Sequence, residues 1–132
     1  MIVRHAQCSC GRISIRCEGE PGRRSVCHCL ACQRRTGSAF GCTAWFSEAQ
    51  VQAEGEPRLW TRRGDDGGEG RFRFCPTCGS TVWWTCEALP GQVAVAVGGF
   101  ADPEFPPPLV SVYENRKHPW LDHFADLDLE RY

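Results

Sequence analysis

The sequence predicts a mainly antiparallel β protein with at most short helices, folded as a single domain over residues 1–132. Three observations support this prediction. The length suffices for one hydrophobic core, and short runs rich in β-branched and aromatic residues recur along the chain. Ten cysteines, most of them in tight clusters, indicate metal sites. Hydrophobic residues make up 42% and charged residues 23%, which is typical of a globular domain and not of a disordered chain.

Six segments have the composition of β-strands. They are residues 13–17, 41–46, 71–74, 81–85, 93–97 and 110–113. A short helix is predicted to start after Cys29 and run through Arg35, because "LACQRR" contains good helix formers and Gly37 can end it. The glycine-rich stretch "RRGDDGGEGR" at 62–71 predicts an exposed, mobile turn between strands.

The C-terminal third is harder to assign. "DPEFPPP", at residues 102–108, cannot pair in a central strand and is expected to be a rigid connector. The final "HPWLDHFADLDLERY" is amphipathic but interrupted, and its pattern favours no single structure.

The cysteines favour thiolate metal sites over disulfides. "MIVRHAQCSC" has no apolar segment before its first cysteine, so no export signal is read in it and the cytoplasm is the expected compartment. Cysteines that lie one or two residues apart also chelate a metal more readily than they pair with distant partners.

Charge and hydropathy argue against two classes of partner. Fifteen basic residues nearly balance sixteen acidic ones, giving a net charge of -1 and no global field to attract nucleic acid or anionic lipid. The longest apolar run, residues 93–97, is far too short to cross a bilayer. We therefore predict neither nucleic-acid nor membrane binding.

Seven clustered cysteines divide as four plus three. "CPTCGS", with Cys75 and Cys78, is a zinc-knuckle signature: a tight turn lets backbone N–H groups donate to the sulfurs, and Gly79 takes a conformation that a Cβ would oppose. A knuckle supplies two ligands and needs two more. "CSCG", with Cys8 and Cys10, is its natural partner, which predicts a closed, structural four-thiolate zinc site.

The remaining cluster lies in "VCHCLACQRRTGS". Cys27, Cys29 and Cys32 form a three-ligand set with an open fourth position, the arrangement that catalytic zinc uses. We therefore predict two zinc ions per chain, one enclosed and one open to a substrate.

Other assignments stay open. A fourth ligand from this chain would make the second site structural. The candidates are His28, Cys17, Cys42 and Cys86. His28 is the weakest, because adjacent residues of an extended segment point to opposite sides, and isolated cysteines in strands are more often apolar filler. Pairing the knuckle with the triplet instead would leave Cys8 and Cys10 with too few partners.

The open site indicates a particular chemistry. Three thiolates give the zinc unit a net charge of about -1, which blunts its Lewis acidity relative to a site of neutral histidines. Such a site suits a soft ligand, and a substrate thiolate would complete a four-sulfur shell. Arg34 and Arg35 follow the cluster, and Arg23 and Arg24 precede it. Two of these arginines are candidate contacts for the carboxylates of an acidic thiol, although arginines more often lie on a solvated surface.

These motifs resemble those of the glutathione-dependent formaldehyde-activating enzyme family, also called the centromere protein V and formaldehyde-activating domain family. The resemblance runs nearly end to end through "CSCGRISI", "CHCLACQRRTGSAF", "FRFCPTCGSTVWW", "VAVGGFADP" and "HPW". It implies a small zinc-binding fold of stacked, β-tent-like antiparallel sheets. It also implies structural zinc on Cys8, Cys10, Cys75 and Cys78 and reactive zinc on Cys27, Cys29 and Cys32.

The family's named activity joins formaldehyde to glutathione to give S-hydroxymethylglutathione, and is classed as a carbon–sulfur lyase. For this chain the resemblance implies that zinc on Cys27, Cys29 and Cys32 binds and deprotonates a small thiol, which then adds to a carbonyl. The expected partner is glutathione, another small thiol or an aldehyde adduct. The sequence leaves the thiol and the carbonyl unassigned.

Two other functions compete with this interpretation. The first is a non-catalytic zinc-binding module for a protein or nucleic acid, as the centromere relatives suggest; those relatives use basic extensions, which this sequence does not show. The second is a redox protein, which would need a reactive free thiol at Cys42 or Cys86.

Several single residues carry weaker predictions. Thr36 and Ser38 are candidate donors to an oxyanion, or else satisfy local backbone groups. Three of the five tryptophans are expected in the core or on a sheet face, with one of them able to line the pocket. They are Trp45, Trp83 and Trp84. His118 matches a family position by its context before "PW".

Overall fold

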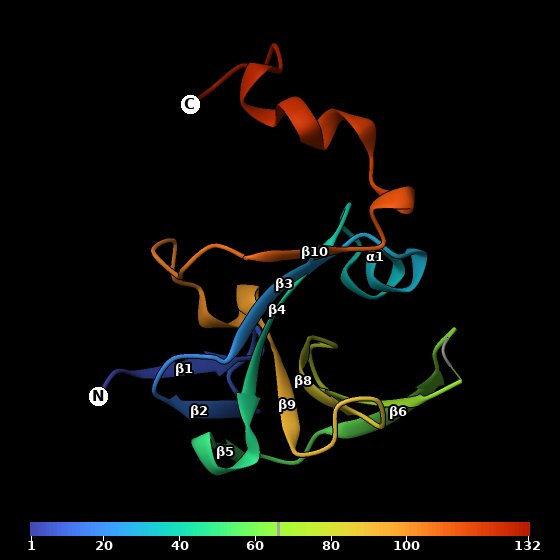
Figure 1. Ribbon diagram of the computed structural model, residues 1–132. Coiled ribbons are helices and arrows are strands. Elements are labelled where there is room, and N and C mark those ends of the chain that lie inside the picture. Colours follow the sequence, from blue (N-terminus) through green and yellow to red (C-terminus); the bar gives the residue numbers. More distant parts are fainter. Residues whose placement is uncertain (66) are drawn as a thin grey trace.

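The computed structural model describes residues 1–65 and 67–132, and Figure 1 shows a chain built mainly of strands. A small sheet has the strand order β1-β2-β5 and a large sheet the order β10-β3-β4-β9-β8-β7-β6. The small sheet comprises β1 (Val3–Gln7), β2 (Ser14–Glu18) and β5 (Val51–Glu54). The large sheet comprises β3 (Arg23–Cys27), β4 (Gly41–Ser47), β6 (Arg58–Arg63), β7 (Glu69–Phe74), β8 (Thr81–Cys86), β9 (Gln92–Ala96) and β10 (Val110–Val112).

The described helices are short. They are α1 (Leu30–Thr36) and the 3-10 helices η1 (Glu48–Gln50), η2 (Val97–Phe100), η3 (Glu114–Arg116) and η4 (Pro119–Asp126). The predicted fold class is therefore confirmed. Within the described residues no helix combines the length and the apolar character that a membrane span requires.

All six predicted strands are present, each with ends within two residues of those predicted, and the helix after Cys29 is one residue longer than predicted. The sequence analysis missed β1, β3, β5 and β6. Arginine-rich strands such as β3 ("RRSVC") and β6 ("RLWTRR") lack the apolar pattern that identified the others. Among the described residues, all strand pairs are antiparallel except β10 with β3, whose pairing is parallel and follows the connector at 102–108.

The turn predicted at 62–71 is shorter than expected, because β6 continues through Arg63 and β7 begins at Glu69. Residue 66 of that turn lies outside the described residues. At the other end of the chain, η4 breaks at His123, whose φ of -137° and ψ of 39° are not helical. This break accounts for the interrupted amphipathic pattern, and Figure 1 shows the segment (red) leaving the body of the molecule.

The main core lies between the two sheets. The small sheet contributes Ala6, Ile15 and Cys17, and the large sheet contributes Ala44, Phe46, Val82, Val93 and Val95. Because successive strand residues point to opposite faces, Trp45 lies on the outer face of the large sheet, where a second cluster of Phe72, Trp84 and Ala94 forms. This outer aromatic cluster lies beside the candidate active site described below.

An irregularity in β8 explains how neighbouring residues reach different clusters. Phe72 pairs with Trp84 and Arg73 with Trp83, but Phe74 pairs with Thr81, so the register skips Val82. One extra residue shifts the alternation of faces. Val82 and Trp83 therefore pack toward the main core, while Trp84 joins the outer cluster.

A close approach between the residue that follows β5 and the residues that precede β2 gives a stability prediction at Gly55. This residue has φ of +91°, and a Cβ there would lie 2.3 Å from the Arg12 carbonyl oxygen and 3.0 Å from the Ile13 Cα. We expect Gly55→Ala to lower the free energy of unfolding by about 3 kcal/mol, since both strain and a backbone clash oppose it. Gly91→Ala is the matched control, because Gly91 has φ of +76° but open space around it, and it should cost only about 1 kcal/mol. Equal midpoints for the two variants in urea unfolding would contradict the packing argument.

Candidate metal centres and active-site cleft

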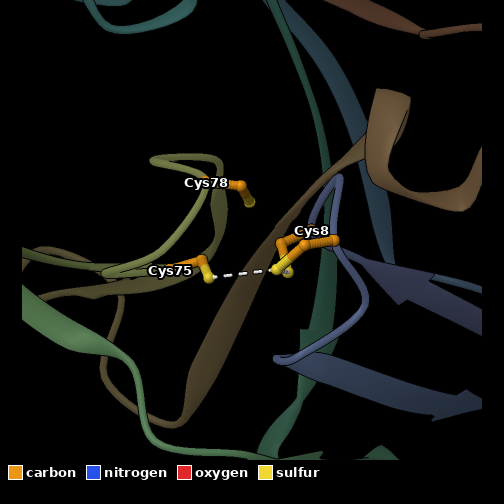
Figure 2. A group of neighbouring side chains, drawn as sticks. Cys8, Cys75 and Cys78 are labelled. Atoms are coloured by element: carbon orange, nitrogen blue, oxygen red, sulfur yellow. Dashed lines mark hydrogen bonds between the residues drawn. The ribbon is translucent and has the colours of Figure 1, made fainter.

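The first cysteine cluster joins the two sheets. Cys8 and Cys10 lie in the turn between β1 and β2, and Cys75 and Cys78 lie in the turn between β7 and β8. All four sulfurs are within 4.8 Å of one another, with 3.7 Å between Cys8 and Cys10 and 3.6 Å between Cys10 and Cys75. Figure 2 shows side chains from the two turns converging on one point. Tetrahedral zinc with Zn–S bonds of about 2.3 Å requires S–S separations of about 3.8 Å, so this set fits the ion.

The backbone of both turns is shaped around the sulfurs. Ile13 N donates to Cys8 Sγ at 3.4 Å, and Thr77 N donates to Cys75 Sγ at 3.4 Å. Gly79 has φ of +81° and donates its N–H to the Cys75 carbonyl oxygen at 2.8 Å, as predicted for the knuckle. N–H donors aimed at sulfur stabilise thiolates, which are the metal-binding form.

Polar neighbours also favour the ionised sulfurs of this cluster. Hydrogen bonds from Ser80 lower the pKa of Cys78 to about 5. Hydrogen bonds from the Arg12 backbone and side chain lower the pKa of Cys10. The Ser80 hydroxyl also lies 3.0 Å from that of Ser9, so a direct hydrogen bond links the two turns.

The second cluster surrounds the start of α1. Cys27 ends β3, Cys29 is the N-cap residue of α1, and Cys32 lies in its first turn. The three sulfurs are within 4.8 Å of one another, and Cys32 N donates to Cys29 Sγ at 3.3 Å. Gly37 ends the helix in a left-handed conformation and leads to β4. The strand–helix–strand connection thus brings three sulfurs to one point, and β10 pairs with β3 at Cys27.

The Cys27 and Cys32 thiols interact directly. A hydrogen bond from Cys27 lowers the pKa of Cys32 to about 5, and the same contact raises the pKa of Cys27. The cluster therefore holds at least one thiolate at neutral pH, ready for a soft metal ion.

No fourth cysteine, histidine or carboxylate joins this triplet within residues 1–65 and 67–132. His28 points elsewhere: it is buried, its Nε2 lies 3.4 Å from Glu114 Oε2, and its ring packs 6.1 Å from that of Phe40. Burial raises the pKa of Cys17 to about 12 and also raises that of Cys42. Of the two thiols on which the redox alternative depends, Cys42 is therefore a poor nucleophile, whereas Cys86 lines the cleft described below.

The triplet lies in the wall of a cleft of about 740 Å³. Besides the three cysteines, Cys86 and several aliphatic residues line it, together with side chains of three further kinds. They are the basic Arg23, Arg34, Arg62 and Arg116, the acidic Asp65 and Glu69, and the aromatic Trp45, Phe72 and Tyr113. Trp45 is therefore the tryptophan at the pocket, whereas Trp83 lines a different cleft and Trp84 is buried. No histidine lines this cleft in the part of the chain that the structure describes.

The two arginines predicted to contact a substrate lie in different places. Arg34 lines the cleft, but Arg35 does not. Successive residues of an α-helix point about 100° apart, so one arginine reaches the cleft while the next turns to the sheet. There the Arg35 guanidinium lies 4.3 Å from the centre of the Trp84 ring.

Other predicted residues have local roles. The Thr36 hydroxyl donates to the Cys32 carbonyl oxygen at 2.8 Å and accepts from Ser38 N at 3.1 Å, so it satisfies backbone groups at the end of α1. His118 Nε2 lies 2.9 Å from Gln33 Oε1 and ties the C-terminal segment to α1. Sequence reasoning missed Arg62, Arg116 and Tyr113, because only the folded strand order brings them to the cleft.

A comparison with protein families agrees with this geometry. The model of the glutathione-dependent formaldehyde-activating enzyme family matches residues 3–116, which include all seven clustered cysteines. The chain belongs to this family. Membership relates the protein to the chemistry of glutathione and formaldehyde.

Comparison with solved structures supports the fold of this family member. A Rhodobacter sphaeroides protein solved by crystallography is similar with a TM-score of 0.59 and 20% sequence identity. The similarity covers 81% of this chain and 98% of the other. No curated protein matches the sequence significantly.

Proposed function

We propose that this chain is a zinc-dependent enzyme of the carbon–sulfur lyase type, which joins a small acidic thiol to a carbonyl as S-hydroxymethylglutathione synthase does. One observation carries the proposal: four sulfurs form a complete set between the sheets, whereas three sulfurs form an incomplete set in the wall of a basic cleft. Cys8, Cys10, Cys75 and Cys78 would hold a structural ion. Cys27, Cys29 and Cys32 would hold the ion that meets the substrate.

The zinc, when bound, supplies an electrophilic position that keeps a substrate thiol ionised at neutral pH. The thiol loses its proton to water in the cleft, its sulfur forms a bond to the carbonyl carbon, and the carbonyl oxygen takes up a proton. The overall addition therefore consumes no acid or base. The absence of a lining histidine in the described chain fits this scheme, since a preformed thiolate needs no histidine general base.

The cleft's arginines would select and orient the thiol. Arg34 comes from α1, Arg23 from the start of β3 and Arg62 from β6, so three elements place positive charge around one opening. Guanidinium groups bind carboxylates in a fixed, bidentate geometry. Trp45 and Phe72 add an apolar wall to the cleft.

The proposal predicts an effect of Arg34 that depends on substrate charge. Arg34→Gln should weaken the binding of glutathione about tenfold, because a charged hydrogen bond to a carboxylate is lost. The same variant should bind 2-mercaptoethanol, which has no carboxylate, as well as the wild type does. Both affinities can be measured by titrating thiol into protein with cobalt at the second site and following its visible spectrum.

Two results would separate the proposal from its competitor. A cobalt spectrum that no thiol perturbs would leave a non-catalytic zinc-binding module as the better description. A spectrum that responds to thiols, without acceleration of S-hydroxymethylglutathione formation over the uncatalysed reaction of glutathione with formaldehyde, would retain the site but exclude this carbonyl partner.

A further inference from the structure

We propose that Arg35 is a positioning residue for the second metal centre: its guanidinium offsets the negative charge of the Cys27, Cys29 and Cys32 sulfurs and so favours the arrival of one more thiolate. The inference concerns how the site works and rests on the function proposed above. It differs from the prediction made from sequence, in which Arg35 would bind a substrate carboxylate.

The first observation is the shared space around Gly41. Arg35 Nη2 lies 2.9 Å from the position that a Cβ on Gly41 would occupy, and Cys32 Sγ lies 3.7 Å from the same position. The guanidinium and the sulfur therefore both lie beside this glycine, in contact with the same space. Gly41 also pairs with Cys27 in the register of β3 and β4. The guanidinium thus lies near the place where β4 pairs with the Cys27 end of β3 and where α1 carries Cys32.

The second observation is what holds Arg35 there. Its guanidinium lies 4.3 Å from the centre of the Trp84 ring and 5.9 Å from that of Phe72. Both rings are nearly buried, and they stack on each other at 5.4 Å in the outer cluster. A planar guanidinium stacks on such rings, whereas the compact ammonium of lysine does so less well. The aromatic cluster therefore fixes the orientation of the arginine.

The third observation is the lack of any other counter-charge. Among residues 1–65 and 67–132 no carboxylate forms an ion pair with Arg35, although several other arginines of the chain have one. A partly enclosed cation without a carboxylate is unfavourable unless another anion faces it. The cysteine sulfurs are the anionic groups that this geometry provides.

These observations imply different roles for the neighbouring Arg34 and Arg35. Arg34 faces the cleft and would recognise the far end of a substrate. Arg35 lies beside Cys32 and outside the lining of the cleft, and it would act on the negative charge of the sulfurs. A donor to a ligand sulfur draws charge from it, which makes a bound metal ion a better acceptor for an incoming thiolate.

The test compares two variants with two thiols in protein that carries cobalt at the second site. Arg35→Gln should weaken the binding of glutathione and of uncharged 2-mercaptoethanol alike, each by about tenfold, a loss within the range typical of groups that support metal ligands. Arg34→Gln is the matched control and should affect glutathione alone. Arg35→Lys should give an intermediate loss, because it keeps the charge but loses the stacking geometry.

A readout that needs no thiol separates a failure of this inference from a failure of the proposed function. In the thiol-free cobalt protein, Arg35→Gln should move the sulfur-to-cobalt charge-transfer band to lower energy, since the ligand sulfur regains electron density, and Arg34→Gln should leave the band in place. Gly41→Ala, whose methyl group would lie 2.9 Å from Arg35 Nη2 and 3.3 Å from Cys32 Cβ, should move the band in the same direction, because the flexible guanidinium is the group that gives way. Circular dichroism checks that each variant is folded, and the Gly41 variant tests the idea if loss of Arg35 prevents folding.

The outcomes are distinct. An unchanged band together with unchanged 2-mercaptoethanol affinity in Arg35→Gln would overturn the inference, and so would a loss confined to glutathione. If no thiol alters the spectrum of the wild type, the proposed function fails while the band position still decides the role of Arg35.

Discussion

Cys78→Ser is expected to unfold the domain. Cys78 belongs to the cluster that joins the β1–β2 turn of one sheet to the β7–β8 turn of the other. Structural zinc of this kind contributes roughly 10 kcal/mol to folding, which is comparable with the whole stability of a small domain of about 5–15 kcal/mol. Loss of one thiolate should release this ion and much of that free energy.

The measurement is zinc content combined with circular dichroism and thermal denaturation. Cys42→Ser is the matched control, because Cys42 is a half-buried cysteine that belongs to neither cluster. It should retain two zinc ions and a cooperative transition. A folded Cys78→Ser protein with the wild-type transition midpoint would show that the first cluster does not hold the sheets together.

Much of the structure of the two cysteine clusters follows from local sequence. The two cysteine turns and the short helix were predictable, since spacing, glycine conformation and helix capping act within a few residues. The closeness of the Cys8 and Cys75 sulfurs was also predictable, because the four ligands of one zinc ion must lie together however far apart they are in the sequence.

Long-range features were not predictable from this sequence. The arginine-rich strands β3 and β6 take their structure from pairing partners and not from their own composition. The basic cleft follows from that pairing, since it places Arg62 of β6 opposite residues from α1 and η3. The separate orientations of Arg34 and Arg35 likewise depended on where the outer aromatic cluster formed.

Cys29→Ser is expected to have the opposite effect: the domain stays folded while the second metal centre is lost. Cys29 is the N-cap of α1, where its sulfur accepts a hydrogen bond from Cys32 N at 3.3 Å. Serine is among the preferred N-cap residues, so its hydroxyl can make the same bond and preserve the helix. A serine hydroxyl is a poor ligand for zinc beside soft thiolates, however, and two sulfurs are too few to retain the ion firmly.

Cys29→Ser should therefore bind one zinc ion where the wild type binds two, and keep a thermal midpoint near that of the wild type. Its affinity for glutathione should fall by more than the 10- to 100-fold loss that is typical when a residue that only supports a metal ligand is replaced. Metal analysis, thermal denaturation and thiol titration on one preparation test the three expectations together. Two retained zinc ions would contradict the assignment of Cys29 as a ligand. Loss of folding would mean that both metal centres are structural, because a site that serves only the substrate can be emptied without unfolding the chain.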